Sequence, residues 1–320
     1  MQDMRGAAFI LSAAVMSAEV TIEHTGYQGW HNCWRVTNGT VEVIVTGDVG
    51  PRILRYAYVG GRNIFKEYAA QMGKSGESEY QIRGGHRLWV APEDLKTTWA
   101  MDNGSVQVEG VGGVLTATQP VDGAGFQKQI VVRLAPTGSE VEVVHRVRNM
   151  SSLPMDVAPW ALTMMAPGGV GITGFPPRGK HPDALLPTNP LVMWAYTNLG
   201  DPRWGFTRKY LTLRQDPKNN EPQKVGLFNA KTWGAYLLGS ELFVKQTTAD
   251  STKRYPDFGS SFETFTNGEM LELETLGPMH RLDQAQAMEH VEKWLLRRNV
   301  RVAEWTDAEL DRAVGALLAR

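Results

Sequence analysis

The sequence predicts an all-β protein, and two observations support that prediction. Apolar and polar residues alternate with a period of two in one stretch after another, as in TVEVIVTG at residues 40–47. Turns rich in glycine, proline and asparagine interrupt these stretches about every 8–12 residues, a spacing typical of antiparallel sandwiches and barrels. Successive strand–helix–strand units are not apparent, which disfavours a parallel doubly wound sheet.

The alternating stretches continue along the chain, at residues 52–65, 104–119, 126–149 and 233–248. In the third of these, alternate residues from Phe126 to Leu134 share one face, and APTGSE at residues 135–140 is the expected turn. Residues 166–190 and 200–224 are rich in proline and glycine, and we expect them to be long functional loops. Because apolar residues run through both stretches, we expect one large domain without a linker.

A short helix is expected at the C-terminus, within residues 303–320. Thr306 and Glu309 have the spacing of a capping box, in which each side chain bonds the other residue's backbone N–H. The helical period then places several apolar side chains on one face, which we expect to pack on the domain. These side chains are Leu310, Ala313, Val314, Leu317 and Leu318.

The N-terminal residues 1–18 resemble a secretory signal peptide, because Arg5 precedes an apolar run from Ala7 to Val15. The alternative interpretation is an apolar N-terminal strand or helix. A signal peptide predicts a periplasmic or secreted protein, whereas a segment without that role predicts a cytoplasmic one. Nothing else in the chain approaches the run of about 20 apolar residues that spans a membrane.

Charge and composition exclude several classes of function. The 320 residues include 33 basic and 34 acidic side chains, and this formal charge of -1 argues against nucleic acid as a partner. Cys33 is the one cysteine, so the chain has no cysteine metal cluster, and its histidines lack metal-ligand spacing. GGVGITG at residues 168–174 lacks the strand and helix of a dinucleotide site. We therefore expect no metal and no cofactor.

The segment IRGGHRLWVAPED at residues 82–94 gathers several side chains suited to binding a hydroxyl-rich ligand. On a strand, Arg87 and Trp89 share one face, whereas His86 faces the other way unless the double glycine kinks the strand. A guanidinium donates several hydrogen bonds, and an indole offers an apolar plane. The alternative is that Trp89 is core, Arg87 pairs with Glu93, and His86 is hydrogen-bonded at a turn.

Two further segments contain candidate site residues. In MLELETLGP at residues 270–278, Glu272 and Glu274 project to one side of an otherwise apolar strand. A buried carboxylate needs a partner, and a half-buried one with a raised pKa can act as a general base; a solvated outer face is the alternative. In FNAKTWGAY at residues 228–236, Lys231 and Trp233 are a candidate donor and platform, with an exposed lysine and a core tryptophan as the alternative.

Several motifs resemble those of known proteins. GPRILRYAYVGGRNIF at residues 50–65 looks like the early hairpin of galactose-mutarotase-like proteins, with Arg52 at the arginine position. MLELETLGP resembles the strand that carries the catalytic glutamate of aldose 1-epimerases, with Glu274 at that position. The longer motifs YQGWHNCWRVTNGTVEVIV, GGHRLWVAPE, YPDFGSSFETFTN and MEHVEKWLL resemble a bacterial family of unassigned activity within that superfamily.

This resemblance implies a β-supersandwich of antiparallel strands over residues 19–302, with a cleft that binds a neutral carbohydrate. Mutarotases also use an acid histidine from a central segment, but the corresponding residues 158–169 contain no histidine. We therefore expect sugar binding with altered or lost isomerase activity. The alternatives are an active mutarotase, epimerase or glycan-cleaving enzyme that uses Glu274 with His86, and a non-catalytic protein-interaction module. The expected pocket residues are Arg52, His86, Arg87, Trp89, Glu93 and Glu274.

Overall fold

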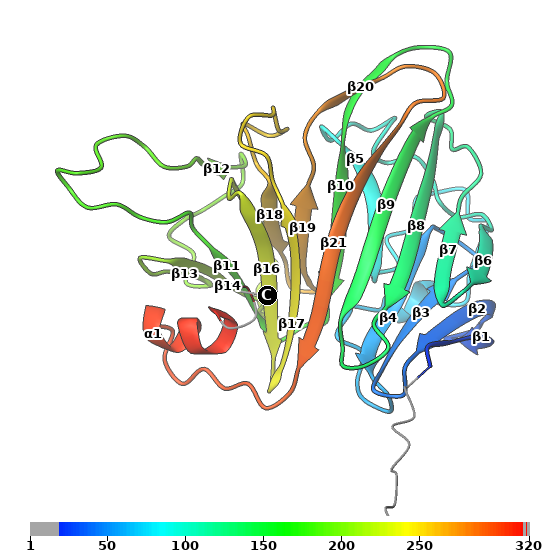
Figure 1. Cartoon of the computed structure of the whole chain (residues 1–320), viewed down its shortest axis with the longest axis horizontal. Helices are drawn as coiled ribbons and strands as arrows, with labels where there is room; N and C mark the ends of the chain where they lie inside the picture. The colour runs from blue at the N-terminus through cyan, green and yellow to red at the C-terminus, as the bar shows by residue number, and fades with distance from the viewer. Residues whose placement is uncertain (1–18, 316–317, 319–320) are drawn as a thin grey trace, which may run out of the picture.

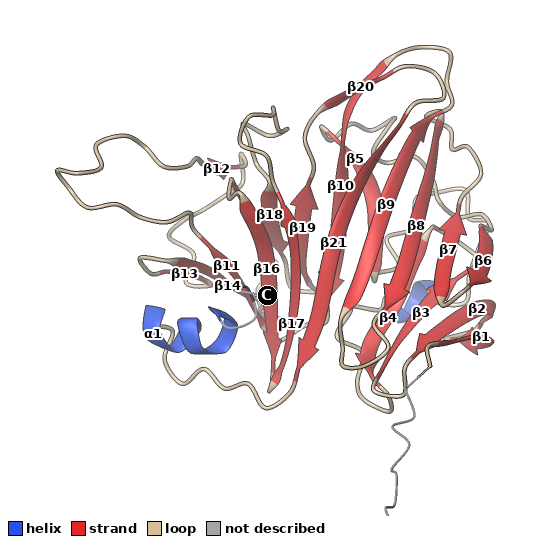
Figure 2. Ribbon diagram, in the orientation of Figure 1, coloured by secondary structure: helices blue, strands red, loops and turns tan. Residues whose placement is uncertain are grey.

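A computed structural model describes residues 19–315 and residue 318. In this part of the chain nearly all regular structure is β-strand, and every strand pairing is antiparallel. The strands form two large twisted sheets packed face to face (Figure 1, Figure 2). The predicted all-β supersandwich of antiparallel strands with a short C-terminal helix is confirmed.

The first sheet has eleven strands among the described residues. Ten of them lie side by side in the order β1 (Thr21–Tyr27), β2 (Trp30–Thr37), β3 (Val41–Thr46), β4 (Arg52–Tyr58), β5 (His86–Ala91), β10 (Met155–Met165), β19 (Leu271–Leu276), β18 (Phe262–Thr266), β15 (Gln223–Leu227) and β12 (Leu191–Met193). The short strand β20 (His280–Leu282) also pairs with β10. A one-turn 3-10 helix, η1 (Ala69–Gln71), lies in the connection between β4 and β5.

The second sheet has ten strands in the described part of the chain. Their order is β13 (Trp204–Phe206), β14 (Tyr210–Arg214), β11 (Val170–Gly174), β16 (Lys231–Leu238), β17 (Glu241–Thr248), β21 (Ala287–Arg297), β9 (Val141–Asn149), β8 (Phe126–Leu134), β7 (Val114–Thr118) and β6 (Gln107–Val111). The chain crosses between the sheets several times, so strands that are distant in sequence become neighbours.

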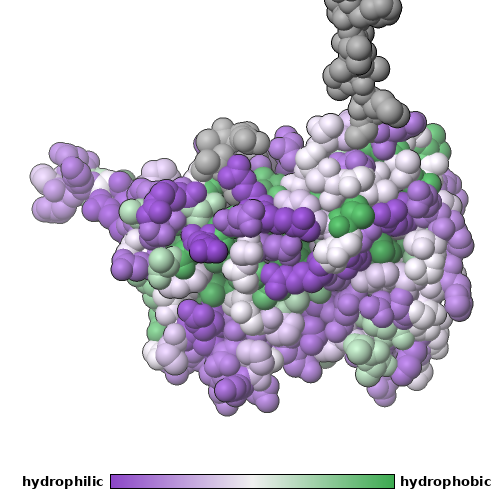
Figure 3. Space-filling model, turned by 90° about the horizontal axis from the view of Figure 1, so that it is seen from below, coloured by the Kyte–Doolittle hydropathy of each residue, from purple (hydrophilic) through white to green (hydrophobic). Residues whose placement is uncertain are grey.

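The two long stretches expected to be loops differ in the structure. The stretch 166–190 contains the buried strand β11, so the prediction of a loop was wrong there, but residues 175–190 form a loop that projects from the body and is seen as a hydrophilic lobe in Figure 3. The stretch 200–224 contains β13 and β14, so the prediction of a loop there was also wrong. Trp204, Leu211 and Leu213 from these strands are buried in the core, and this burial outweighs the local proline and glycine content.

Aromatic and aliphatic side chains fill the space between the sheets. Phe65 and Phe243 meet edge to face with ring centroids 5.7 Å apart, and Trp294 lies 5.7 Å from both of these rings. Such pairs contribute about 0.5–1.5 kcal/mol each beyond the burial of their area. Val132 of β8 and Val141, Val143 and Val147 of β9 complete this core, as the period-two alternation predicts.

The C-terminal helix α1 (Asp307–Leu310) begins where the capping residues predict. The Thr306 hydroxyl accepts a hydrogen bond from the Glu309 backbone N–H, and the chain continues into a π-helical turn, η2 (Asp311–Gly315). Leu310 and Val314 pack against the outer face of the second sheet, and Leu317 lies outside the described residues. The helices of the described chain are too short to form a membrane span. The predicted signal peptide, residues 1–18, also lies outside the described residues.

A charged pair is fully buried between the two sheets. The Lys245 ammonium lies 2.7 Å from a Glu292 carboxylate oxygen and donates hydrogen bonds to the carbonyl oxygens of Ala161 and Leu273. Glu292 also accepts a hydrogen bond from the Trp294 indole. Each charge therefore has several partners, which is the condition for burying an ion pair at tolerable cost.

His86 and His145 extend this interior network. Their Nε2 atoms are 2.6 Å apart, while the Nδ1 atom of His86 contacts the Thr163 hydroxyl. Burial lowers the pKa of both imidazoles, so both are neutral near pH 7. Nitrogen atoms of these two residues and an oxygen of Glu292 lie within 4.8 Å of one another, but the Lys245 ammonium supplies the cation of the cluster.

Replacing Lys245 tests whether this network stabilises the sandwich. Lys245→Met leaves the Glu292 charge buried without a cation, so we expect the free energy of unfolding to fall by about 3–5 kcal/mol. Lys293→Met, on an exposed position of β21, is the matched control and should change it by less than about 0.5 kcal/mol. Urea unfolding at neutral pH measures both variants. Equal losses in the two variants would contradict this assignment.

Candidate functional site

Strand β19 is covered on both faces, which places two glutamates in an unusual position. Leu271 and Leu273 point into the core between the sheets. The pleat therefore turns Glu272 and Glu274 to the outer face of the first sheet, where both are nonetheless buried. An outer face that is covered rather than solvated requires partners for these carboxylates.

A row of residues in register joins Glu274 to Arg87. Arg87 on β5 pairs with Leu162 on β10, Leu162 pairs with Glu274 on β19, and Glu274 pairs with Glu263 on β18. Directly opposed residues in an antiparallel pair lie on the same face of the sheet. The next row contains Trp89 opposite Trp160, whose rings lie edge to face with centroids 5.4 Å apart.

Lys224 is the cation that pairs with the carboxyl groups of Glu263 and Glu274. Its ammonium lies 2.7 Å from a Glu263 oxygen and donates to Glu274 Oε2 at 3.0 Å. The Trp160 indole N–H donates to the same Glu274 oxygen at 2.9 Å. The ammonium also lies 4.7 Å from the centroid of the Trp160 ring and 4.6 Å from that of Trp194, close enough for cation–π attraction.

Arg87 is the second cation on this face. Its guanidinium carbon lies 3.7 Å from the centroid of the Trp89 ring, and the Nη1 atom donates to the Tyr80 hydroxyl. The Nη2 atom is 3.7 Å from Glu272 Oε1, which is too far for a direct hydrogen bond. Arg87 is therefore held by aromatic contacts, and part of its hydrogen-bonding capacity is unused.

Five polar atoms of this cluster are buried and have no hydrogen-bond partner among the described residues. They are Arg87 Nε, both carboxyl oxygens of Glu263, and the Oε1 atoms of Glu272 and Glu274; of these, Glu263 Oε2 lies 2.7 Å from the Lys224 ammonium as an ion pair. Each unsatisfied buried group costs about 1–3 kcal/mol. Donor and acceptor atoms without hydrogen-bond partners therefore lie together on one face of the sheet. They suit a polar ligand whose hydroxyl groups both donate and accept hydrogen bonds.

The cluster also shifts the pKa of two of its carboxyl groups. Burial, reinforced by the nearby Glu274 charge and opposed by Arg87, raises the pKa of Glu272 to about 7. Burial raises the pKa of Glu263 well above its ordinary range, despite the neighbouring Lys224. The shift of Glu263 therefore favours its protonated form, and Glu272 is poised to gain or lose a proton near neutral pH.

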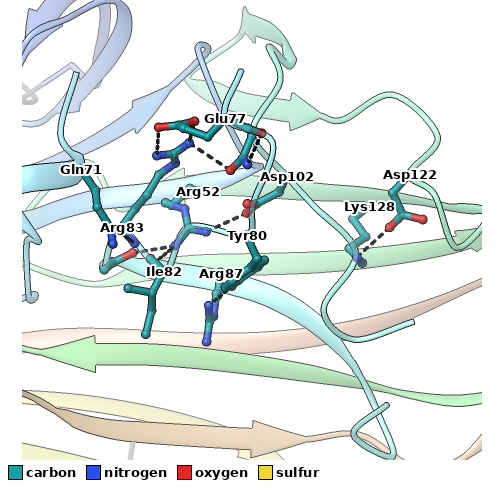
Figure 4. A network of polar contacts seen from close by, with 12 residues as sticks. Arg52, Gln71, Glu77, Tyr80, Ile82, Arg83, Arg87, Asp102, Asp122 and Lys128 are labelled. Carbon is teal, nitrogen blue, oxygen red and sulfur yellow. Dashed lines mark hydrogen bonds and ion pairs between the residues drawn. The ribbon is translucent and has the colours of Figure 1, made fainter. Parts of the chain in front are cut away.

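Arg52 lies beside this cluster and supports it. Its guanidinium is fully buried, pairs with Asp102 at 2.7 Å and donates to the backbone oxygens of Ile82 and Gly84 (Figure 4). Figure 4 also shows Tyr80 next to both Arg52 and Arg87. By bonding Ile82 and Gly84, Arg52 holds in place the segment before β5, which includes Tyr80.

The double glycine before β5 is required by close backbone contacts. Gly84 and Gly85 both have positive φ, and an added Cβ would lie 2.1 Å from the Lys66 oxygen or 2.3 Å from the Ile53 oxygen. This tight approach sets the start of β5, and the strand alternation that follows keeps His86 and Arg87 on opposite faces. The structure therefore places His86 between the sheets, away from Glu274.

The other predicted site residues occupy different places. Glu93 is exposed and accepts a hydrogen bond from the Trp99 indole, whose ring centroid is 4.9 Å from that of Trp89. Glu93 therefore lies at the rim of the cluster. Lys231 and Trp233 are on β16 of the second sheet and line a separate cavity.

Sequence reasoning missed three members of the cluster: Lys224, Glu263 and Trp160. Lys224 falls in the stretch expected to be a loop, although it lies on β15. Glu263 alternates with Phe262 and Thr264 in SSFETFTN, and that alternation was a usable signal for a second glutamate strand. Trp160 follows a proline in β10, and nothing local indicates that it faces Glu274.

The fold and the outer-face cluster together define a β-supersandwich with a polar site on one sheet. No family model matches the sequence, and a search of curated proteins found no match. Among solved structures, the chain is similar to a galactose mutarotase-like protein from Lactobacillus casei, with a TM-score of 0.52 and 12% identity over 82% of this chain and 99% of that one. A candidate aldose 1-epimerase from Klebsiella pneumoniae gives a TM-score of 0.57 and 9% identity over 94% and 87% of the two chains. The chain therefore has the galactose mutarotase-like fold.

The shifted pKa of Glu272 predicts a pH dependence of stability. The unfolded chain releases this proton near pH 4.5 and the folded chain near pH 7, so the folded state loses stability as pH rises through that window. Glu272→Gln removes the titration, so its stability relative to the wild type should rise by about 3 kcal/mol between about pH 4.5 and pH 8. Urea unfolding at both pH values measures this difference.

Glu304→Gln is the control for this measurement, because Glu304 is exposed. Its stability relative to the wild type should not change with pH. A constant difference for Glu272→Gln across the same window would show that Glu272 titrates normally.

Proposed function

We propose that this protein binds a neutral carbohydrate on the outer face of the first sheet. The observation that supports this most strongly is the group of five buried polar atoms without a hydrogen-bond partner beside the Trp89 and Trp160 rings. Sugar hydroxyls both donate and accept hydrogen bonds, and the C–H face of a pyranose packs on an indole. Similarity to mutarotase-like structures agrees with this assignment at the level of the fold.

Charge balance favours a neutral ligand. Lys224 pairs with Glu274 and Glu263, burial favours the protonated form of Glu263, and Arg87 faces Glu272. A ligand with a full charge would leave an uncompensated ion in a buried site, at a cost of several kcal/mol. A sugar without a charged group satisfies the open atoms without that penalty.

Access to the site requires side-chain movement. Arg87 is 3% exposed and Trp89 is 6% exposed, with Tyr80 and Trp99 packed beside them. A ligand reaches the open atoms when these aromatic side chains move aside. A purely structural role, as in a protein-interaction module, would call for Arg87 to be fully paired internally, whereas its Nε atom has no partner among the described residues.

A second candidate function is sugar mutarotation with Glu272 in a proton-transfer role. Mutarotation needs a base for the anomeric hydroxyl and an acid for the ring oxygen. His86 and Glu274 lie on opposite faces of the sheet and do not face one ligand. Glu272 lies on the same face as Glu274, and its pKa of about 7 suits it to donate and accept a proton near neutrality.

A panel of neutral mono- and oligosaccharides tests the binding proposal by thermal shift and calorimetry. We expect at least one member to bind the wild type, and Glu274→Gln to weaken that binding about tenfold or more, because a charged acceptor is lost. Glu304→Gln, far from the cluster in sequence and exposed, should bind like the wild type. The proposal fails if no sugar binds, or if Glu274→Gln binds as tightly as the wild type.

Anomer exchange measured by NMR tests the mutarotation candidate. If Glu272 transfers the proton, the wild type accelerates exchange of a bound sugar and Glu272→Gln slows it about a hundredfold or more. Binding by the same variant should persist, since the amide retains hydrogen-bonding atoms. Exchange at the uncatalysed rate in the presence of wild type would leave binding alone as the function.

A further inference from the structure

The second sheet has a cavity on its outer side, separate from the first-sheet cluster. Its volume is about 1080 Å³, and β14, β16, β17 and β21 contribute to its walls. Of these strands, β14 and β16 lie next to α1 in Figure 1, and the start of the loop after β11 closes one side. The size suits a ligand of one or more rings, since ligand pockets usually measure about 300–1,000 Å³.

The lining of this cavity is positively charged. Lys231, Lys293 and Arg208 are exposed and line it, and no carboxylate among the described residues lies within ion-pairing distance of any of the three. Glu289, which also lines the cavity, is paired with Arg146 at 2.6 Å. The whole chain carries a formal charge of -1, so these open cations are a local concentration of charge that attracts an anion.

Aromatic and amide side chains lie beside one of these cations. Trp233 on β16 pairs in register with Gln246 on β17, and Gln246 pairs with Lys293 on β21. All three therefore lie on the outer face, with Trp233 and Lys293 about 10 Å apart across two strand spacings. Gly174 makes room for the indole, because an added Cβ there would lie 2.8 Å from the Trp233 ring.

Buried His290 is also among the lining residues, but the alternation of β21 turns its side chain to the inner face, opposite Lys293. The Thr275 hydroxyl donates to the Glu292 carboxylate, so it accepts from the His290 Nε2–H, which lies 2.7 Å away. Burial lowers the pKa of His290 to about 3, so the imidazole is neutral and its Nδ1 atom carries a lone pair. Nδ1 makes no hydrogen bond within the described chain, although His290 is only 6% exposed and lines the cavity.

We propose that this cavity binds an anionic saccharide, a sugar ring that carries a carboxylate or a phosphate group. Lys231, Lys293 and Arg208 attract the anionic group, and Trp233 provides an apolar wall for the ring. The cavity lies on the opposite sheet from Glu274 and shares no residue with that site. This proposal is therefore independent of the function proposed for the first sheet.

Calorimetry with glucuronate, glucose 6-phosphate and neutral glucose tests the proposal. We expect at least one of the two acids to bind the wild type, and the comparison between them separates carboxylate from phosphate recognition. The double variant Lys231→Gln/Lys293→Gln should weaken that binding about tenfold or more, because two charge-assisted contacts are lost. Raising the salt concentration should weaken it as well, since these cations are exposed to solvent.

Two control variants make the result specific. Lys218→Gln removes an exposed lysine elsewhere, and Glu274→Gln alters the first-sheet site; both should bind the acid like the wild type. Three results would overturn the proposal: neither acid binds, the lysine double variant binds as tightly as the wild type, or Glu274→Gln abolishes binding. The last result would place the acid in the first-sheet site.

Discussion

The two-sided burial of β19 is the constraint on which the site depends. Its leucines pack in the core between the sheets. Because side chains alternate along a strand, its glutamates must lie on the other face. That face is covered by Tyr80, Trp99 and other aromatic side chains, and the carboxylates are therefore cut off from bulk water. Partners for them come from strands that are distant in sequence, above all Lys224 on β15 and Arg87 on β5.

Two polar clusters lie on opposite sides of the first sheet, and they differ in how completely they are paired. Between the sheets, Lys245 and Glu292 have ion-pair and hydrogen-bond partners for their charged atoms. On the outer face, Arg87 and the three glutamates retain open atoms. A fully satisfied network stabilises a fold, whereas an incompletely satisfied one costs free energy unless a ligand completes it. This contrast separates a structural role inside the sandwich from a binding role outside it.

The sequence predicts the structure correctly where a local pattern determines which face of a strand a side chain occupies or where a helix begins. Alternation in LELETL and HRLWVA was sufficient to predict that Glu272 and Glu274 share one face and that Arg87 and Trp89 share one face. The all-β fold class and the helix cap at Thr306 depend on similarly local patterns. The same alternation places His86 opposite Arg87; the prediction that it joins the pocket depended on a kink at the double glycine and on the resemblance to mutarotases, and the strand does not turn His86 to that face.

Long-range pairing is what the sequence does not reveal. Lys224 reaches Glu274 because β15 lies one strand beyond β18, an order that no local pattern determines. Lys231 and Trp233 have the residue types of a sugar site, but β16 belongs to the other sheet. Residue type thus indicated the kind of chemistry, and strand order decided which residues share a site.

The most direct test of the central claim is a ¹H–¹⁵N NMR titration that follows the tryptophan indole signals while a neutral sugar is added. Substitution of Trp160 by phenylalanine assigns its signal, which reports on the hydrogen bond to Glu274. We predict that the Trp160 and Trp89 signals shift and saturate together as the sugar occupies the outer face. Unchanged signals from both indoles, at sugar concentrations that bind elsewhere on the protein, would contradict the account.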